Sequence, residues 1–224
     1  MCSGGQTRRA APLGRPTLAL TLSACMPSLS PLRPYPRLFA PRTQITFTNT
    51  CLALPAFFFA YDALYAPFHR ALHHRSIYAY VHKHHHRQVV PTRGNTDAIN
   101  VHPFEFLVGE YNHVLAIFLI SRYVTDVHAL TCIMFLIVGG TLATLNHTRL
   151  DVGAIHLPFT KVPIFGVRAH DTHHAIPNTN FGQYIMLWDY VMGTFRLHPQ
   201  DPGSVESLRG DVLVDYAAEK QKAG

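Results

Sequence analysis

The chain has 224 residues, of which 48% are hydrophobic and only 14% are charged. Soluble domains carry about 25% charged residues, and so apolar a composition excludes intrinsic disorder for most of the chain. The net charge of +6 comes from residues 1–61, which hold six arginines and no acidic residue. A nucleic-acid-binding domain would carry its basic residues on the folded part, so we exclude that class. The four cysteines are far apart, which argues against a disulfide scaffold or a thiolate zinc site.

The N-terminal segment, residues 1–44, contains seven of the 16 prolines and no Asp or Glu. Its prolines forbid a long helix, and its Arg-rich, acid-free composition is typical of an organelle transit peptide. An unstructured tail or a wrongly assigned start of the gene would have the same composition. We therefore expect three parts: this segment, a folded domain over residues 45–200, and a polar C-terminal tail over 201–224.

The first apolar stretch, residues 43–61, has 19 uncharged residues. A helix of this length covers about 28 Å at 1.5 Å per residue, which is close to the hydrocarbon thickness of a bilayer. We expect this stretch to enter the membrane.

The next segment is unusually rich in histidine, because seven of the 16 histidines fall within residues 69–86. Residues three and four apart share a helix face, so histidines at these spacings present several imidazoles to one point, as HExxH does for zinc. The segment contains an HxxxH pattern and an HxxHH pattern, formed by His69 and His73 and by His82, His85 and His86.

Two further apolar stretches follow, residues 111–121 and 127–148. The second is the clearest candidate span, since its 22 residues include no charged side chain, and the two could form a helical hairpin turned at 122–126. The Gly139–Gly140 pair would let another helix approach closely. A buried helix pair in a soluble bundle is the alternative, but the low total charge favours an all-α, integral membrane helical bundle.

A second HxxHH motif, formed by His170, His173 and His174, follows the last apolar stretch. Two copies of this spacing exceed what chance would place in such a chain, and a loose His-rich loop would not repeat it. His147, at the end of 127–148, is a candidate ninth ligand. Zinc takes four ligands, so eight or nine imidazoles suit two metal ions, and ligand type alone leaves zinc, copper, iron and nickel open.

Six other histidines are not expected to bind metal. They point off the shared face, stand alone in apolar helices, or belong to surface or loop positions. They are His74, His84, His113, His128, His156 and His198.

These motifs resemble those of the fatty acid hydroxylase/sterol desaturase superfamily. The resemblance covers about residues 50–196 and rests on HRALHH, YAYVHKHHH, NVHPFE, LNHTRLD and AHDTHHAIPNTNFGQYIMLWDYVMGTF. It implies an integral membrane, non-haem di-iron oxygenase with the histidine layer at the cytosolic face. Relatives usually carry two apolar spans before HxxxH, whereas this chain shows one.

The resemblance also implies roles for individual residues. It makes all nine histidines metal ligands, and it leaves the role of His102 open. Asp171 and Asp151 would accept hydrogen bonds from ligand imidazoles. Four residues match the closing motif and could act directly or through capping and packing: Asn180, Gln183, Trp188 and Asp189.

The activity that the resemblance implies is O2-dependent hydroxylation or desaturation of a membrane lipid, such as a sterol or fatty acyl chain, by two iron ions. Zinc in the site would indicate an inactive form. The chain has no GxGxxG and no CxxCH motif, so electrons would come from a partner, cytochrome b5 with its reductase, or ferredoxin. We expect a multi-pass protein of the endoplasmic reticulum, or of a plastid if residues 1–44 target it there. The alternatives are carotenoid hydroxylation and a non-catalytic membrane metal-binding protein.

Overall fold

The computed structural model describes residues 44–198, except residues 90, 149, 151, 153, 157 and 159–162. All described residues belong to one compact unit. The expected transit peptide and C-terminal tail lie outside the described residues, and so does Asp151.

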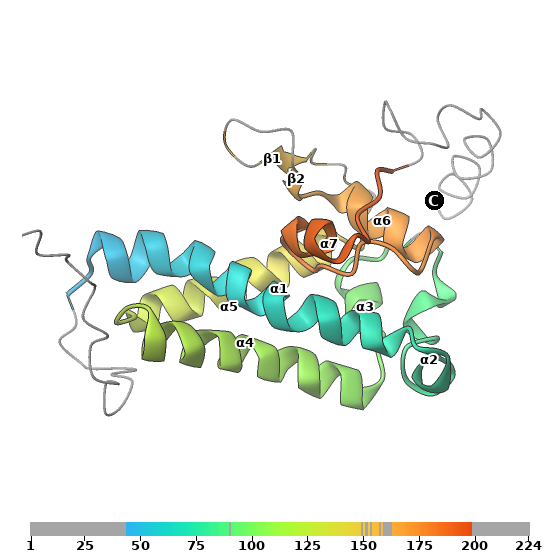
Figure 1. Ribbon diagram of the computed structural model, residues 1–224, viewed down its shortest axis with the longest axis horizontal. Helices are drawn as coiled ribbons and strands as arrows, with labels where there is room; N and C mark the ends of the chain where they lie inside the picture. The colour runs from blue at the N-terminus through green and yellow to red at the C-terminus, as the bar shows by residue number, and fades with distance from the viewer. Residues whose placement is uncertain are drawn as a thin grey trace, which may run out of the picture. The chain divides into compact units, whose positions relative to one another are not determined.

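The central element is α1 (Ala53–Leu72), which follows a single π-helical turn, η1 (Thr48–Leu52). It packs against both α4 (Pro103–Tyr123) and α5 (Ala129–Leu145), and Figure 1 shows the three helices running alongside one another. Phe57 of α1 contacts Phe135 of α5, with ring centroids 5.1 Å apart. The helices α4 and α5 make few direct contacts. The two helices of the expected hairpin, α4 and α5, therefore pack against α1 rather than against each other.

The outer faces of these helices are apolar. The segments Thr48–Leu72 and Pro103–Tyr123 are long and apolar enough to cross a membrane, yet only 28% and 33% of their apolar windows are buried inside the protein. Phe59, Leu107 and Ile137 are examples of large apolar side chains that are at least 45% exposed. A soluble bundle buries such faces against neighbouring helices, so the exposed faces favour a lipid environment.

The helix boundaries differ from those expected from uncharged stretches. The first apolar helix continues past residue 61 and contains Asp62, while α4 begins at Pro103 instead of residue 111 and contains Glu105. Both carboxylates are buried and contact polar groups of other elements, which is why a charge does not end either helix. The clearest span in the sequence gives the shortest of the three helices, 17 residues long, because His128 caps its N-terminus.

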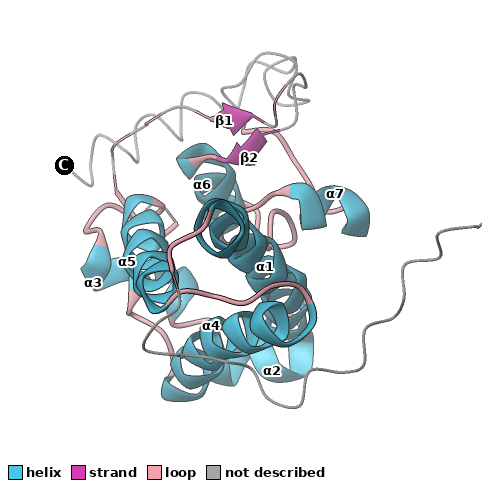
Figure 2. Ribbon diagram, turned by 90° about the vertical axis from the view of Figure 1, so that its left-hand side faces the viewer, coloured by secondary structure: helices cyan, strands magenta, loops and turns pink. Residues whose placement is uncertain are grey.

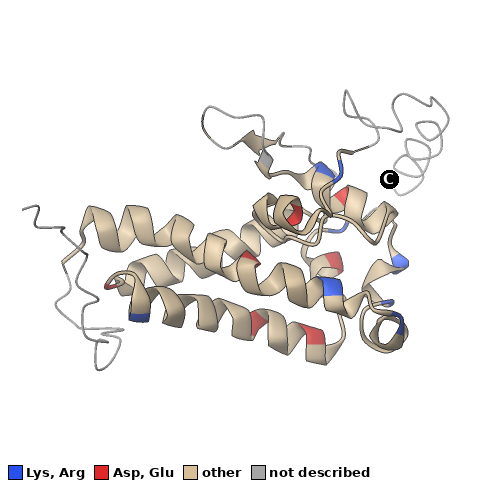
Figure 3. Cartoon of the chain, viewed as in Figure 1, with Lys and Arg blue, Asp and Glu red and all other residues tan. Residues whose placement is uncertain are grey.

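The remaining elements are short and polar. Figure 1 shows α2, α3 and α6 near one end of the apolar bundle, Figure 2 shows the two strands beside α6, and Figure 3 shows Lys and Arg mainly on elements at that end of the bundle. Among the described residues, two short antiparallel strands and an isolated bridge between Arg93 and Thr148 depart from an all-helical fold. These elements are α2 (Arg75–Val81), η2 (His85–Arg87), α3 (Asn95–Ala98), β1 (Ile155–His156), β2 (Pro163–Phe165), α6 (Val167–Ala175) and α7 (Leu187–Met192).

Candidate metal centre

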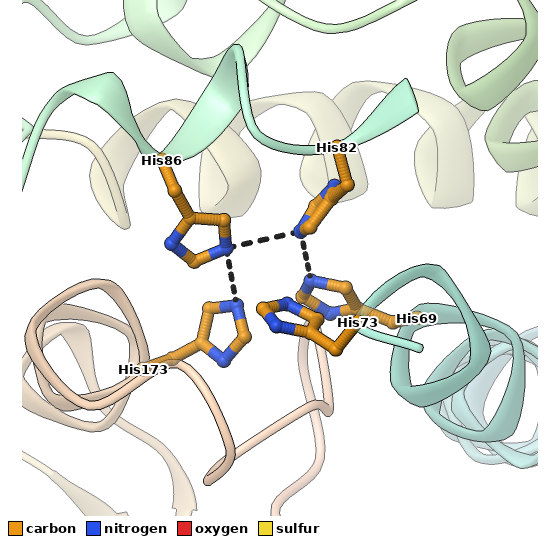
Figure 4. Close-up of side chains that lie close together, drawn as sticks. All are labelled: His69, His73, His82, His86 and His173. Atoms are coloured by element: carbon orange, nitrogen blue, oxygen red, sulfur yellow. Dashed lines mark hydrogen bonds between the residues drawn. The ribbon is translucent and has the colours of Figure 1, made fainter. Parts of the chain in front are cut away.

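The structure brings together all nine histidines that were expected to bind metal. They form two groups, and within each group the candidate ligand nitrogens all lie within 4.8 Å of one another. Figure 4 shows the rings of the first group converging from three separate segments of the chain. The first group is His69, His73, His82, His86 and His173, and the second is His85, His147, His170 and His174.

Each HxxHH motif contributes to both groups. In the first motif, His82 and His86 belong to the first group and His85 belongs to the second. In the motif of α6, only His173 belongs to the first group, and the other two histidines belong to the second. Residues 82–86 form a turn and a 3₁₀ turn instead of the expected α-helical turn. The two groups adjoin, since the ring centroids of His86 and His174 are 4.7 Å apart.

The spacing of the ring nitrogens matches a metal coordination sphere. In the first group the Nε2 atom of His82 lies 3.0 Å from Nε2 of His69 and 3.0 Å from Nε2 of His86. In the second group the Nε2 contacts range from 3.1 to 3.5 Å. Two imidazole nitrogens about 2.1 Å from one ion are about 3.0 Å apart at a right angle and about 3.4 Å apart in a tetrahedron. The five nitrogens of the first group exceed the four ligands that tetrahedral zinc accepts.

Hydrogen bonds behind the rings orient four of the histidines. In each case Nδ1 faces a backbone carbonyl oxygen, which can only accept, so Nδ1 carries the proton and the opposite Nε2 presents a lone pair to the centre of the group. The pairs are His69 with Phe181 O (2.9 Å), His147 with Ala143 O (2.8 Å), His173 with Thr179 O (2.6 Å) and His174 with Gln88 O (2.9 Å). Glu105 Oε1 lies 2.8 Å from Nδ1 of His82.

This assignment makes both groups fit a cation. In the first group the Nε2 atoms of His69 and His173 both present lone pairs, and in the second those of His147 and His174 do so. The ligand atoms of each group lie within 4.8 Å of one another, and a positive ion between such lone pairs offsets their repulsion. The donor set and its proton positions therefore fit a bound metal ion.

Burial keeps these imidazoles neutral, which is the form that binds metals. Burial first, and the neighbouring histidines second, lower the pKa of His86 to about 3 and that of the half-buried His73 to about 2. The same two causes hold the pKa of His173 well below its ordinary value. Protons therefore compete weakly with a metal ion for these sites at neutral pH.

Asp171 is buried in α6, and its expected role as an acceptor for a ligand imidazole stays a prediction. Glu105 was missed by the sequence analysis, although the HPFE segment signals it through an acid at the start of an apolar helix. His102 is exposed and caps α4, where its Nδ1 accepts a hydrogen bond from Phe104 N at 3.2 Å.

Two buried carboxylates hold the segment 181–185 beside the first group. Asp62 of α1 accepts hydrogen bonds from the backbone N–H groups of Gln183 (2.9 Å), Tyr184 (2.8 Å) and the next residue. Asp189 of α7 accepts those of residues 181 and 182, at 2.7 and 2.8 Å. Five consecutive amides are thereby fixed, and with them the residue 181 carbonyl that orients His69.

Gly182 is required at the centre of this segment. A Cβ at that position would lie 2.9 Å from an Asp189 carboxylate oxygen and 3.0 Å from the Ile185 carbonyl oxygen. The close approach of backbone to carboxylate explains the glycine in the NFGQY motif.

The other matched residues of the closing motif act through packing and hydrogen bonding. Asn180, whose φ is 51°, donates to the carbonyls of residues 169 and 196. Trp188 Nε1 donates to the Phe59 carbonyl at 3.1 Å. The Gln183 carbonyl accepts from Asn146, the neighbour of His147, at 2.9 Å.

Most histidines outside the two groups lie at the surface or cap a helix. His74, His84 and His156 are exposed. His128 caps α5, and His198 is buried in the loop after α7 rather than lying at the surface. The remaining one, His113, contacts Tyr184 within the helical bundle.

The fold and the site define a mostly helical protein in which two adjoining, all-histidine groups at one end of an apolar bundle could each hold a metal ion. The family model for fatty acid hydroxylases matches residues 54–194. The chain therefore belongs to the fatty acid hydroxylase family, as its motifs predicted.

Curated relatives include the lathosterol oxidases of Rattus norvegicus and Homo sapiens. The rat protein is 31% identical over 76% of this chain and 52% of its own length, and the human protein is 29% identical over 69% and 47%. A very-long-chain aldehyde decarbonylase of Oryza sativa subsp. indica is 32% identical over 59% of this chain and 22% of its own length. The chain thus spans about half the length of the lathosterol oxidases. No solved structure matches the chain significantly.

Proposed function

We propose that this protein is a membrane-embedded oxidoreductase that uses two iron ions and O2 to hydroxylate or desaturate a lipid. The observation that carries the proposal is the convergence of nine buried or half-buried imidazoles into two adjoining groups. Family membership and relatives named as a lathosterol oxidase and an aldehyde decarbonylase support lipid oxidation over simple metal storage.

The proposed ligands divide as the two groups do. His69, His73, His82, His86 and His173 would hold one ion, and His85, His147, His170 and His174 the other. Iron fits better than structural zinc because one group offers five nitrogens, more than tetrahedral zinc takes, and neither group includes a thiolate. When bound, the two ions supply the activation of O2 and the transfer of electrons.

The residues of the chain perform the remaining tasks. Four backbone carbonyls keep four Nδ1 atoms protonated, so that the opposite nitrogens are free to bind metal. Glu105 contacts a fifth ligand imidazole, at His82 Nδ1. Burial of the groups excludes bulk water from the reacting atoms. Hydroxylation inserts one oxygen atom into a C–H bond and releases the other as water, which consumes two electrons and two protons.

The exposed apolar faces of α1, α4 and α5 support a position in the bilayer, from which a lipid substrate can reach the histidine groups laterally. We place these groups at the cytosolic face of the endoplasmic reticulum, with cytochrome b5 and its reductase as electron donor. Ferredoxin would take that role if residues 1–44 direct the protein to a plastid.

A comparison of cellular lipids tests the proposal. Cells expressing the wild type and a suitable reductase should accumulate a hydroxylated or desaturated lipid that cells expressing His173→Ala lack. The His84→Ala protein serves as the control, because His84 is exposed and belongs to neither group. Identical lipid profiles for the wild type and His173→Ala, at equal expression, would contradict the oxidoreductase proposal.

A further inference from the structure

A cavity of about 180 Å³ lies in the crevice between α1, α4 and α5. His85 and His147 of the second histidine group line it, and so do His113 of α4 and Tyr184 of the segment 181–185. One cavity therefore connects the candidate metal centre with a polar pair inside the apolar bundle.

The two sets of residues lie at different depths. The pair is next to Gly139 of α5, since a Cβ there would be 3.0 Å from the Tyr184 hydroxyl oxygen and 3.5 Å from His113 Nε2. From Gly139 to His147 the chain advances eight residues, or about 12 Å at the rise of a helix. Gly140, Ala143 and Thr144 line the cavity between these levels.

The polar pair is joined by one hydrogen bond. His113 Nε2 lies 3.2 Å from the Tyr184 hydroxyl oxygen, and His113 Nδ1 lies 3.8 Å from a Glu110 carboxylate oxygen. With the ring proton on Nδ1, which faces this acid, Nε2 accepts the hydrogen bond from the Tyr184 hydroxyl. The Tyr184 oxygen keeps lone pairs that can accept a further hydrogen bond.

Within the described part of the chain, the Tyr184 side chain hydrogen-bonds only to His113. Tyr184 is 3% exposed and His113 is 8% exposed. Burial raises the pKa of the Tyr184 hydroxyl above its ordinary value, so that it remains protonated. Polar pairs at membrane depth are costly and usually serve a function.

The charges around the cavity restrict what can bind. The lining includes two acids, Glu105 and Glu110, and no Lys or Arg. A carboxylate or phosphate group would be desolvated there without a cation to pair with it. A hydrocarbon would leave the acceptor oxygen of Tyr184 without a partner.

We propose that Tyr184, oriented by His113, accepts a hydrogen bond from the hydroxyl group of an uncharged lipid whose chain extends along α5 to the histidine groups. This inference rests on the proposed function and adds the substrate class, a hydroxylated neutral lipid. It places the carbon that reacts about 12 Å from the anchored hydroxyl.

Three probes of equal chain length test the proposal: 1-hexadecanol, hexadecane and palmitate. Equilibrium binding of each radiolabelled probe is measured on the purified, detergent-solubilised protein. The wild type should bind hexadecanol about tenfold more tightly than either other probe, since one buried hydrogen bond accounts for roughly that factor. Tyr184→Phe should reduce the preference to within about threefold while it keeps the ring contacts with Phe58 and Tyr61.

Tyr65→Phe is the matched control. Tyr65 also lines the cavity, but its hydroxyl is not part of the pair, so this variant should keep the preference for hexadecanol. Unchanged melting temperature and metal content show that both variants fold. Equal binding of the three probes, tighter binding of palmitate, no binding of any probe, or equal loss of preference in both variants would overturn the proposal.

These measurements distinguish a failure of the proposed hydroxyl site from a failure of the proposed function. A protein that prefers hexadecanol but oxidises no lipid in cells retains the hydroxyl site and loses the proposed function. A protein that oxidises lipids without any preference among the probes retains the function and loses the hydroxyl site.

Discussion

Replacement of Asp62 by asparagine should destabilise the protein and weaken its metal site together. The Asp62 carboxylate is fully buried and accepts three backbone N–H groups from residues 183–185. Gln183 donates to one carboxylate oxygen, and Tyr184 and Ile185 donate to the other. Asparagine has nearly the same shape but offers a single acceptor oxygen and a donor NH2 group.

The magnitude follows from these contacts. A hydrogen bond to a charged acceptor contributes about 1.5–3 kcal/mol, and a buried donor left without a partner costs about 1–3 kcal/mol. In Asp62→Asn at least one of the three amides loses its acceptor and faces an N–H group. We expect a loss of about 3–5 kcal/mol, which lowers the melting temperature of a chain of this size by about 10 °C.

The effect should reach the metal because the same segment carries the Phe181 carbonyl that orients His69. Loss of an orienting partner typically weakens metal affinity by about 10–100-fold. Thermal unfolding in detergent and titration of the metal-free protein with Fe²⁺ measure the two effects.

Glu110→Gln is the matched control, since its side chain is 56% exposed and the change from acid to amide is the same. We expect it to melt within about 2 °C of the wild type, because exposed side chains contribute little to stability. If Asp62→Asn behaved like Glu110→Gln in both assays, the carboxylate would not hold the segment as described.

Three further predictions concern the cavity, the ligand contacts and pH. Gly139→Ala should weaken hexadecanol binding, because its Cβ would approach the tyrosine hydroxyl to 3.0 Å; unchanged binding would contradict this. Glu105→Gln can still accept from the ligand imidazole, but Glu105→Leu cannot, so only the second should weaken Fe²⁺ binding by about 10–100-fold. Burial holds the pKa of His86 near 3 and that of His73 near 2. Their stabilising effect in the chelated protein is therefore complete above pH 6.5 and is lost as the pH falls, by about 1.4 kcal/mol for each histidine at pH 5.5. A melting temperature unchanged between pH 7.5 and 5.5 would refute that reasoning.

The histidines of the site could be predicted from the sequence because metal binding imposes a local spacing. Residues three, four and seven apart reach one point from one or two turns of chain, and this spacing is visible without any tertiary structure. His102 and His113 show the limit of the rule. The first lies close to the ligands in sequence but is exposed, and the second stands alone in sequence but lines the cavity.

The orienting contacts could not be predicted because they join distant parts of the chain. Asp62 contacts amides more than 120 residues away, and Glu105 contacts a histidine of another element. The sequence analysis took uncharged runs of residues as the apolar spans and treated these two acids as lying outside them. The first predicted span therefore ended too early, before Asp62, and the second began too late, after Glu105. The apolar character of the helices was predictable from composition, but the central position of α1 depends on packing between helices.

The most direct test of the whole account is the number of iron ions that the protein binds. Anaerobic purification followed by elemental analysis should find about two irons per chain in the wild type and in His84→Ala. The same analysis should find most of the metal lost in His85→Ala and His173→Ala, which remove one ligand from each group. Zinc in place of iron, or equal metal content in all four proteins, would contradict a two-iron centre built by these histidines.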